Sequence, residues 1–350
     1  MQTSESMFWK EIQKEPLSIE ESLKANLPTI KKIANEVKER KIDRVVLAGR
    51  GSSDHANQVA KYLFEIYCGM IVSIATPSVL TCYKGKVDYS NTLLIGVSQS
   101  GCAKDLAFVM NNAYERGAIV VSITNEKGSL MSGIGNYRMN NACGPEKSVT
   151  AAKSYLTQTA LLTALVAEIS NNKKLHSVIS NLSETVRYAL TLEGQVRNII
   201  PLLRNTSHML IMGRGLLYAL AQETELKIQE TCYLDARSYA TSDYQHGPMA
   251  TTNTFVPIIM FAADAKTNDG VVQLLKKLKT QHHVDSIVIS NQKSIANEGS
   301  ASIIFAKKYD GIEAVFVGAV ISQMMACLLS IARGYNPDEP VGISKHTCTF

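Results

Sequence analysis

The sequence Val46-Leu47-Ala48-Gly49-Arg50-Gly51 is a short apolar run that stops at two glycines. The same pattern returns in the second half of the chain as Leu210-Ile211-Met212-Gly213-Arg214-Gly215. An apolar run, then glycines, then small or helix-forming residues is typical of a strand, a turn and the start of a helix. Because the pattern occurs twice, the sequence predicts two similar α/β halves.

Further elements spread outward from these two turns. Apolar runs predict strands at 44–48, 71–75, 92–97, 118–123, 255–261, 286–289 and 303–305, and helical periodicity predicts helices at 19–40, 59–67, 105–116, 270–278 and 313–333, with a long helical region over 154–204. Apolar strands that alternate with helices favour parallel sheets covered on both faces. We therefore expect two tandem doubly wound, flavodoxin-like α/β/α domains at 19–175 and 176–335, joined by long helices. An extension at 1–18 precedes them, and a tail or lid at 336–350 follows.

Composition narrows the class of protein. The chain has 350 residues, 45% of them hydrophobic, which is ample for a large core. A net charge of +5, without a run of five or more like charges, argues against a nucleic-acid partner. Seven cysteines without a CxxC pair, and an N-terminus unlike a secretory signal, favour the cytoplasm. The uncharged stretch 314–332 is expected to be a helix buried in a core or subunit interface, so no membrane partner is predicted.

A second polar turn follows the strand predicted at 92–97. Ser98-Gln99-Ser100-Gly101 lies at the carboxyl edge of the expected sheet and leads into a helix, which suits a phosphate group. Gly51, Ser52 and Ser53 offer similar chemistry at another strand end. Simple helix capping by serine is the alternative. A dinucleotide cofactor is not expected, because Asp54 and Tyr218 stand where the third glycine of that motif belongs.

Three features lie toward the C-terminus. Glu223, Lys227 and Glu230 share one helix face, as catalytic groups or as a solvated row of ion pairs. His246 precedes a Gly-Pro turn and can titrate near neutral pH, although a lone histidine is usually structural. Lys345 lies in the polar tail and is solvated by default. No metal is predicted, since the adjacent pair His282-His283 points to different sides of any regular element.

Taken in order, these motifs resemble the double sugar-isomerase (SIS) proteins, and in particular the isomerase half of glutamine:fructose-6-phosphate amidotransferase. The resemblance runs from the segment Met7-Phe8-Trp9-Lys10-Glu11-Ile12-Gln13-Lys14-Glu15-Pro16 to the final Ser344-Lys345. It includes the turns at residues 51–53 and 98–101, the stretch Glu146 to Lys153, and Tyr239 to Pro248.

The resemblance assigns roles to individual residues. It implies that Ser98, Gln99 and Ser100 hold a sugar phosphate, and that Gly51, Ser52, Ser53 and the backbone at Val149 and Ala151 face the sugar. It implies that Glu230, beside Glu223 and Lys227, moves a proton between C1 and C2. Ring opening falls to His246, donated across the interface of a homodimer. Lys345 would form a Schiff base with the keto sugar.

The sequence also departs from that family. No N-terminal cysteine nucleophile or glutaminase segment is seen, so we expect no glutaminase activity. Cys102 and Ala103 replace Glu-Thr after the phosphate turn, Asp54 replaces an aromatic residue, and Asp243 replaces Glu. We expect ketose/aldose isomerisation coupled to removal or addition of an amine on a 6-phosphorylated amino sugar or sugar-amine adduct, as in deaminases and deglycases, without a cofactor. A simple phosphosugar isomerase or a non-catalytic sugar-phosphate-binding regulator is the alternative.

Overall fold

The computed structural model describes residues 1–284 and 286–345, which fold into two compact units. The first-sheet unit consists of Glu15–Glu146, Lys153–Ser183 and the described residues from Ser344. The second-sheet unit consists of Met1–Lys14, Lys147–Ala152 and Glu184–Ile343. The predicted limits treat the two domains as consecutive stretches, whereas the chain contributes three separate segments to each unit.

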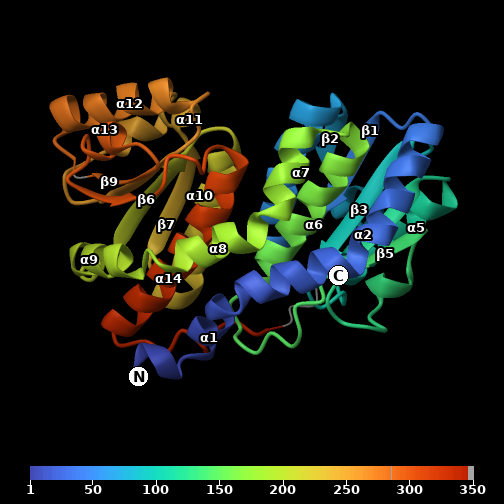
Figure 1. Ribbon diagram of the computed structural model, residues 1–350, viewed down its shortest axis with the longest axis horizontal. Helices are drawn as coiled ribbons and strands as arrows, with labels where there is room; N and C mark the ends of the chain where they lie inside the picture. Colours follow the sequence, from blue (N-terminus) through green and yellow to red (C-terminus); the bar gives the residue numbers. More distant parts are fainter. Residues whose placement is uncertain (285, 346–350) are drawn as a thin grey trace. The chain divides into compact units, whose positions relative to one another are not determined.

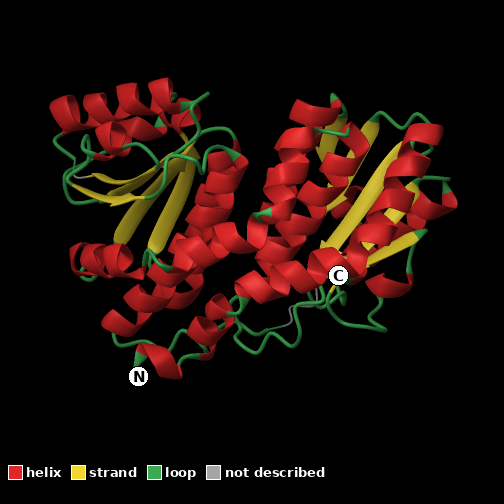
Figure 2. Ribbon diagram, viewed as in Figure 1, coloured by secondary structure: helices red, strands yellow, loops and turns green. Residues whose placement is uncertain are grey.

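Each unit contains a parallel five-stranded sheet (Figures 1 and 2). The strands of the first sheet are β1 Arg44–Ala48, β2 Ile71–Ile74, β3 Thr92–Ser98, β4 Ile119–Thr124 and β5 Tyr137–Asn140. Those of the second are β6 His208–Gly213, β7 Asp235–Ala240, β8 Ile258–Ala262, β9 Ser286–Ser290 and β10 Ala301–Ile304. The orders β2-β1-β3-β4-β5 and β10-β9-β8-β6-β7 are the same topology, used twice. The predicted doubly wound fold and its internal repeat are confirmed.

Helices flank both sheets. In the first-sheet unit they are α2 Glu15–Glu39, α3 Ser52–Leu63, α4 Pro77–Thr81, α5 Lys104–Glu115, α6 Lys153–Ser170 and α7 Lys173–Ser180, with π-helix η2 Phe64–Cys68 extending α3 and 3-10 turn η3 Met131–Gly133. The chain passes from the first-sheet unit to the second-sheet unit near the start of α8 Leu182–Leu190. The second-sheet unit holds η1 Thr3–Glu5, α1 Met7–Gln13, α9 Glu193–Leu203, α10 Leu216–Cys232, α11 Thr241–Tyr244, η4 Pro248–Thr251, α12 Asn268–Lys277, η5 Leu278–His282, α13 Lys293–Ala296 and α14 Ile312–Ala332.

The two strands that the sequence does not predict are β5 and β7. Both lie at one edge of their sheet, next to β4 and β6 respectively. They read Tyr-Arg-Met-Asn and Asp-Ala-Arg-Ser-Tyr-Ala, and most of their residues are only partly buried. An edge strand with one open side needs few apolar residues, so no apolar run marks it.

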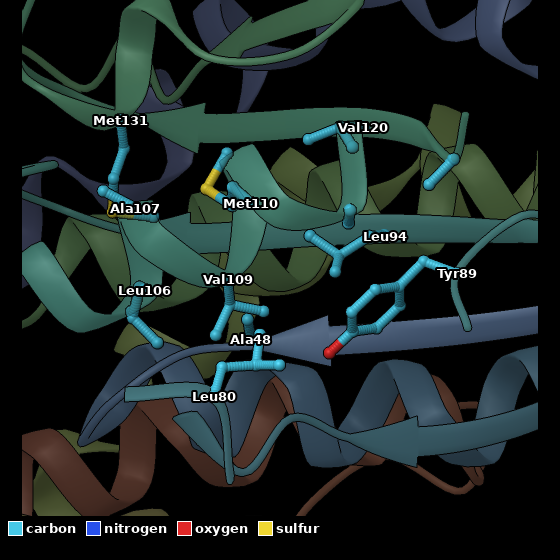
Figure 3. Packing of buried hydrophobic residues seen from close by; sticks show 12 residues of the cluster. Ala48, Leu80, Tyr89, Leu94, Leu106, Ala107, Val109, Met110, Val120 and Met131 are labelled. Carbon is cyan, nitrogen blue, oxygen red and sulfur yellow. The ribbon is translucent and has the colours of Figure 1, made fainter. Parts of the chain in front are cut away.

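The packing of α5 on the first sheet shows why the strands are apolar (Figure 3). Leu106 and Met110 of α5 belong to one buried cluster with Leu94 of β3 and Val120 of β4. Gly96 allows the approach, because a Cβ there would lie 2.3 Å from the sulfur of Met110. The alternate residues of the same strands, such as those at 93 and 95, point to the opposite face, so both faces are buried.

The uncharged segment near the C-terminus is the core helix α14. It is long and apolar enough to cross a membrane, but 94% of its most apolar window is buried within the protein. It packs against α10, where Gly318 lies so close to Leu220 that an added Cβ would be 2.4 Å from the leucine side chain. The hydroxyls of Thr224 and Ser322 join the two helices at 2.8 Å. The prediction of a buried helix at 313–333 is confirmed.

Candidate functional site

The strand order of the first sheet marks one place for a ligand. Between β1 and β3 the order along the chain reverses, so the connections from these two strands leave toward opposite faces and open a crevice at their carboxyl ends. The turns after β1 and β3 are those that carry Ser52, Ser53 and Ser98 to Ser100. The topology therefore brings both predicted polar turns to one switch point.

The turn after β1 depends on its two glycines. A Cβ on Gly49 would lie 2.6 Å from the Asn57 amide nitrogen and 3.0 Å from the Asp54 backbone nitrogen, so the start of α3 folds directly over this residue. Gly51 caps α3 with φ 56° and ψ −134°, which strongly favours glycine. Ser52 and Ser53 then form the first turn of the helix, Ser52 half-buried and Ser53 buried.

The turn after β3 folds back on itself. Ser98 Oγ accepts a hydrogen bond from the Gly101 amide at 3.0 Å, and Ser100 Oγ accepts one from the Cys102 amide at 3.4 Å. Gly101 has φ 64°, and a Cβ there would lie 2.1 Å from Ser129 Oγ. Ser98, Gln99 and Ser100 are half-buried at the sheet edge. Each serine hydroxyl keeps its own hydrogen to donate, which is what an anionic oxygen requires.

Charged groups surround these turns. Arg50 donates to the Asp105 carboxylate at 2.6 Å, joining the first turn to the start of α5. Asp54 is mostly buried in the first turn of α3, and burial raises the pKa of its carboxyl despite opposing effects of His55, Gln58 and Arg50. The edge thus holds one arginine that is already paired and one carboxyl that is held toward its neutral form.

The second sheet has the same turns without the hydroxyls. Leu94 of β3 pairs with Val46 of β1, and Ile258 of β8 pairs with Leu210 of β6. Val46 and Leu210 each lie three positions before the first glycine of the turn that follows their strand. Counting forward, the residues that correspond to Ser98, Gln99 and Ser100 are Ala262, Ala263 and Asp264. A carboxylate in place of the second serine disfavours an anion. The switch-point chemistry expected for a phosphate is therefore confined to the first sheet.

Lys345 is half-buried and forms an ion pair, contrary to its default expectation. Its Nζ lies 2.9 Å from Glu146 Oε2, and the side chain of Glu146 is fully buried. Glu146 also accepts hydrogen bonds from the Ser154 amide at 3.1 Å and the Ser154 hydroxyl at 2.8 Å, and so caps α6. Both residues belong to the first-sheet unit, the unit that carries the Ser98 turn.

The segment that contains Val149 and Ala151 belongs to the second-sheet unit. Ser148, Thr150 and Ala152 are buried, while Val149 and Ala151 between them are half-buried. Val149 and Ala151 are therefore the more accessible residues of this segment. The Ser148 hydroxyl donates to Glu11 and lies 2.8 Å from the Thr150 carbonyl oxygen.

The three charged residues of α10 do not form a solvated face, so that alternative is wrong. Lys227 is fully buried, and its Nζ lies 2.7 Å from Glu230 Oε2 and 3.6 Å from Glu223 Oε1. Glu223 is also buried, whereas the Glu230 side chain is 21% exposed. Because α10 packs on α14, this face of the helix looks into the unit. Glu230 is the member of the group that a ligand can reach.

His246 follows the short helix α11, after the carboxyl end of β7. Its side chain is exposed, and its backbone amide donates to Asp243 O at 3.0 Å. Glu223, Lys227, Glu230 and His246 all belong to the second-sheet unit, and Ser98, Gln99, Ser100 and Lys345 belong to the first-sheet unit. Within the described ranges 1–284 and 286–345, no group of three or more His, Cys, Asp and Glu side chains is placed to hold a metal ion.

Sequence reasoning missed Asn125 and Asn291, two asparagines that hold the loops after the edge strands β5 and β10. Asn125 Nδ2 donates to Gly144 O at 2.9 Å, and Asn291 Nδ2 donates to Tyr309 O at the same distance. Asn125 thereby holds the loop that leads to Glu146. The signal was present, because Ile123-Thr124-Asn125 and Ile289-Ser290-Asn291 extend the internal repeat to a second pair of turns.

Comparison with known families agrees with the fold and the repeat. The SIS domain matches residues 39–168 and again residues 202–333, which together make up most of the chain. The chain therefore belongs to the SIS domain family, and the predicted resemblance is confirmed.

Individual relatives extend this comparison. The chain is 29% identical over 347 residues to a glutamine–fructose-6-phosphate aminotransferase of Pyrococcus horikoshii, covering 97% of this chain and 57% of that protein. The C-terminal domain of glucosamine-fructose-6-phosphate aminotransferase from Francisella tularensis superimposes with a TM-score of 0.84 at 22% identity, covering 95% of this chain and 98% of that one. Glucosamine-6-phosphate deaminase from Thermotoga maritima superimposes with a TM-score of 0.78 at 20% identity, covering 98% and 100%. At these identities the two structures show a shared fold.

Proposed function

We propose that the protein is a phosphosugar-processing enzyme that couples ketose/aldose isomerisation to removal or addition of an amine. Its substrate would be a 6-phosphorylated amino sugar or a sugar-amine adduct, as for a deaminase or a deglycase. The observation that carries the proposal is the ion pair between Lys345 and the buried carboxylate of Glu146. The ion pair holds this tail lysine in the unit that carries the phosphate turn, beside a carboxylate that can take its ammonium proton, and the neutral amine that results can attack a carbonyl.

The switch point supports the binding half of the proposal. Ser98 and Ser100 offer hydroxyl donors, and Ser52 and Ser53 offer the backbone amides and hydroxyls of a helix start. A phosphoryl group on these donors would leave the sugar carbons directed away from the sheet edge. Val149 and Ala151, which are half-buried between buried neighbours, suit contact with the sugar.

Glu230 suits the proton transfer between C1 and C2. A base for this step needs a carboxylate that a substrate can reach and that is held in one orientation. Glu230 is partly exposed, and Lys227 donates to one of its oxygens at 2.7 Å, which leaves the other oxygen for a carbon-bound proton. Glu223 provides a second carboxylate beside the Lys227 ammonium group.

For His246 we propose ring opening in a neighbouring subunit of a homodimer. Its exposure on the loop after α11 suits a residue donated to another copy of the chain. The imidazole can take the hydroxyl proton of the closed sugar at one ring nitrogen and give a proton to the ring oxygen, because its ring nitrogens can both accept and donate.

The alternatives differ in which residues they require. A non-catalytic sugar-phosphate sensor needs Ser98 and Ser100 but not the buried Lys227–Glu230 pair or the seated Lys345. A simple phosphosugar isomerase needs the base but releases no amine. The fold is shared by a protein named as a deaminase and by one named as an isomerase, the latter a tagatose-6-phosphate ketose/aldose isomerase from Escherichia coli. Amine release therefore separates the proposed enzyme from both alternatives, and isomerisation of a phosphosugar separates the two alternatives from each other.

The test is to incubate the protein with glucosamine 6-phosphate and separately with a 6-phosphorylated ketoamine, then to measure ammonia or amine release. A parallel sample receives borohydride, which reduces an imine to a stable amine. The mass of the peptide that contains Lys345 is then measured by mass spectrometry. We expect amine release and a reduced sugar adduct on Lys345, both lost in Lys345→Arg. Binding without adduct or release would favour the sensor. Isomerisation of a neutral phosphosugar alone would favour the simple isomerase.

A further inference from the structure

Glu11 is a buried carboxylate that the proposed chemistry does not use. It lies in α1, outside both stretches matched by the SIS domain. Only 4% of the residue is exposed. Its Oε1 accepts a close hydrogen bond from the Lys147 amide, and its Oε2 accepts from the Ser148 hydroxyl and, at 3.4 Å, from the Ser148 amide. Three donors from one loop therefore converge on a single carboxylate from a distant part of the sequence.

The helix that carries Glu11 is itself firmly held. Phe8 and Ile12 of α1 are fully buried, and α1 packs against α14. Arg197 of α9 lies 5.9 Å from the centre of the Trp9 ring. Because α1 is anchored in the core of its unit, the position of Glu11 is set by packing and not by the loop.

The C-terminal tail is tied to the same helix. Asp338 accepts hydrogen bonds from the Ser6 hydroxyl at 2.7 Å and from the Met7 and Phe8 amides at 2.7 and 2.8 Å. These amides belong to the first turn of α1, where a carboxylate is favoured. The Asp338 carbonyl oxygen accepts from the Val149 amide at 3.5 Å. The loop at 147–149 and the tail that leads to Lys345 therefore share one anchor.

We infer that Glu11 is a positioning residue of the sugar site, which fixes the loop backbone so that Val149 and Ala151 face the ligand. This role rests on the proposed function of that loop. A carboxylate suits the task because it is only an acceptor, and all three groups that it meets are donors. A glutamine of the same shape would turn an N–H₂ group toward one of these donors. The loop would then lose a hydrogen bond and its fixed register.

The test compares Glu11→Gln with Glu20→Gln, which removes the same charge from an exposed position of α2. Hydrogen–deuterium exchange reports the amides of Lys147 and Ser148, and steady-state kinetics with glucosamine 6-phosphate report KM and kcat. In Glu11→Gln we expect exchange at these amides to be roughly tenfold faster and KM to be roughly tenfold higher, with kcat changed by less than about threefold. Exchange within α14 stays unchanged, and Glu20→Gln behaves as the parent.

A second variant keeps the proposal falsifiable if Glu11→Gln does not fold. Ser148→Ala removes one donor and leaves the carboxylate in place, so it should move exchange and KM in the same direction by a smaller factor. Unchanged exchange at 147–148 in these variants would overturn the inference, and so would faster exchange with an unchanged KM. If the parent neither binds nor turns over a phosphosugar, the proposed function fails separately, and the exchange data alone decide whether Glu11 holds the loop.

Discussion

Lys227 is the buried cation at the centre of a group of three charged side chains in the second-sheet unit. It is fully buried between two carboxylates, at 2.7 Å from Glu230 and 3.6 Å from Glu223. Removing the cation takes away the positive charge that lies beside the buried Glu223. We expect Lys227→Met to lower the free energy of unfolding by about 3–5 kcal/mol, as is usual for one broken partner of a buried ion pair. Urea denaturation measures the change.

Two further variants separate charge from shape at this position. Adding Glu223→Gln to Lys227→Met should recover part of the loss, because the buried negative charge beside the removed cation is then gone. Lys266→Met, at an exposed position, should leave the stability unchanged. A loss below about 1 kcal/mol in Lys227→Met would show that the cation contributes no more than a surface ion pair.

Asp54 gives the stability of the first-sheet unit a pH dependence of unusual sign. Burial raises the pKa of its carboxyl, so the folded protein binds this proton more tightly than the unfolded chain does. The resulting stabilisation is fully present below the unfolded value of 3.8 and is lost as the pH rises through the folded value. Asp54→Asn should therefore gain stability relative to the parent at pH 7 and lose that advantage as the pH approaches 3.8.

Asp88 provides the opposite case. Hydrogen bonds from Ser90 lower the pKa of this exposed carboxyl, so its contribution is present at neutral pH and is lost on acidification. The free energy of unfolding of Asp54→Asn, Asp88→Asn and the parent, measured by denaturant at several pH values, should show trends of opposite sign. Parallel trends for the two variants would contradict the assignment.

At the scale of single elements, the turn after β3 can be probed through its thiol. Cys102 follows Ser100 and Gly101 directly and is exposed, as is Cys82 after α4. Burial raises the pKa of Cys143, Cys232 and Cys327 to about 12 in each case. At pH 8 we expect iodoacetamide to modify Cys82 and Cys102 rapidly and these three slowly, as measured by peptide mass spectrometry.

The same experiment locates the ligand. Glucosamine 6-phosphate should slow the modification of Cys102, because a phosphoryl group on the Ser98 turn covers the neighbouring residues. Cys82 serves as the internal control and should react at its original rate. Equal protection of both thiols, or of neither, would place the phosphoryl group away from the turn.

The elements themselves differ in how far sequence could predict them. Central strands such as β3 and β4 are buried on both faces, so their apolar runs mark them plainly. The edge strands β5 and β7 carry no such mark, and the polar segment Tyr137–Asn140 becomes a strand because β4 offers it partners. Local pattern therefore predicts the elements that make the core, and pairing decides those at its margin.

At the scale of the molecule, the contacts that hold the candidate site residues join positions far apart in the chain. The pair Lys345–Glu146 spans 199 positions, and Glu11–Ser148 spans 137. No periodicity or composition predicts a contact of this length, which is why the sequence left Lys345 in solvent and gave Glu11 no role. The turns at Ser52 and Ser98 were predictable, because each needs only a strand end and its own following residues.

The proposed homodimer yields the prediction that belongs to the whole assembly. If His246 of one subunit serves the site that holds Glu230 of another, two inactive variants can restore activity when their subunits are exchanged. His246→Asn and Glu230→Gln should each be inactive alone as homodimers. In a mixed dimer, one site then combines the intact Glu230 of the first chain with the intact His246 of the second, and the other site carries both substitutions.

Random exchange at equal concentrations makes half of the dimers mixed, and each mixed dimer has one working site of two. We therefore expect about a quarter of the parent activity, which is the yield that a shared site in a twofold dimer requires. The measurement is amine release from glucosamine 6-phosphate after the two variants are unfolded together and refolded. Mixing after separate refolding is the control and should give no activity until subunits exchange. If His246 instead serves its own chain, every site carries one substitution, and co-refolding restores nothing.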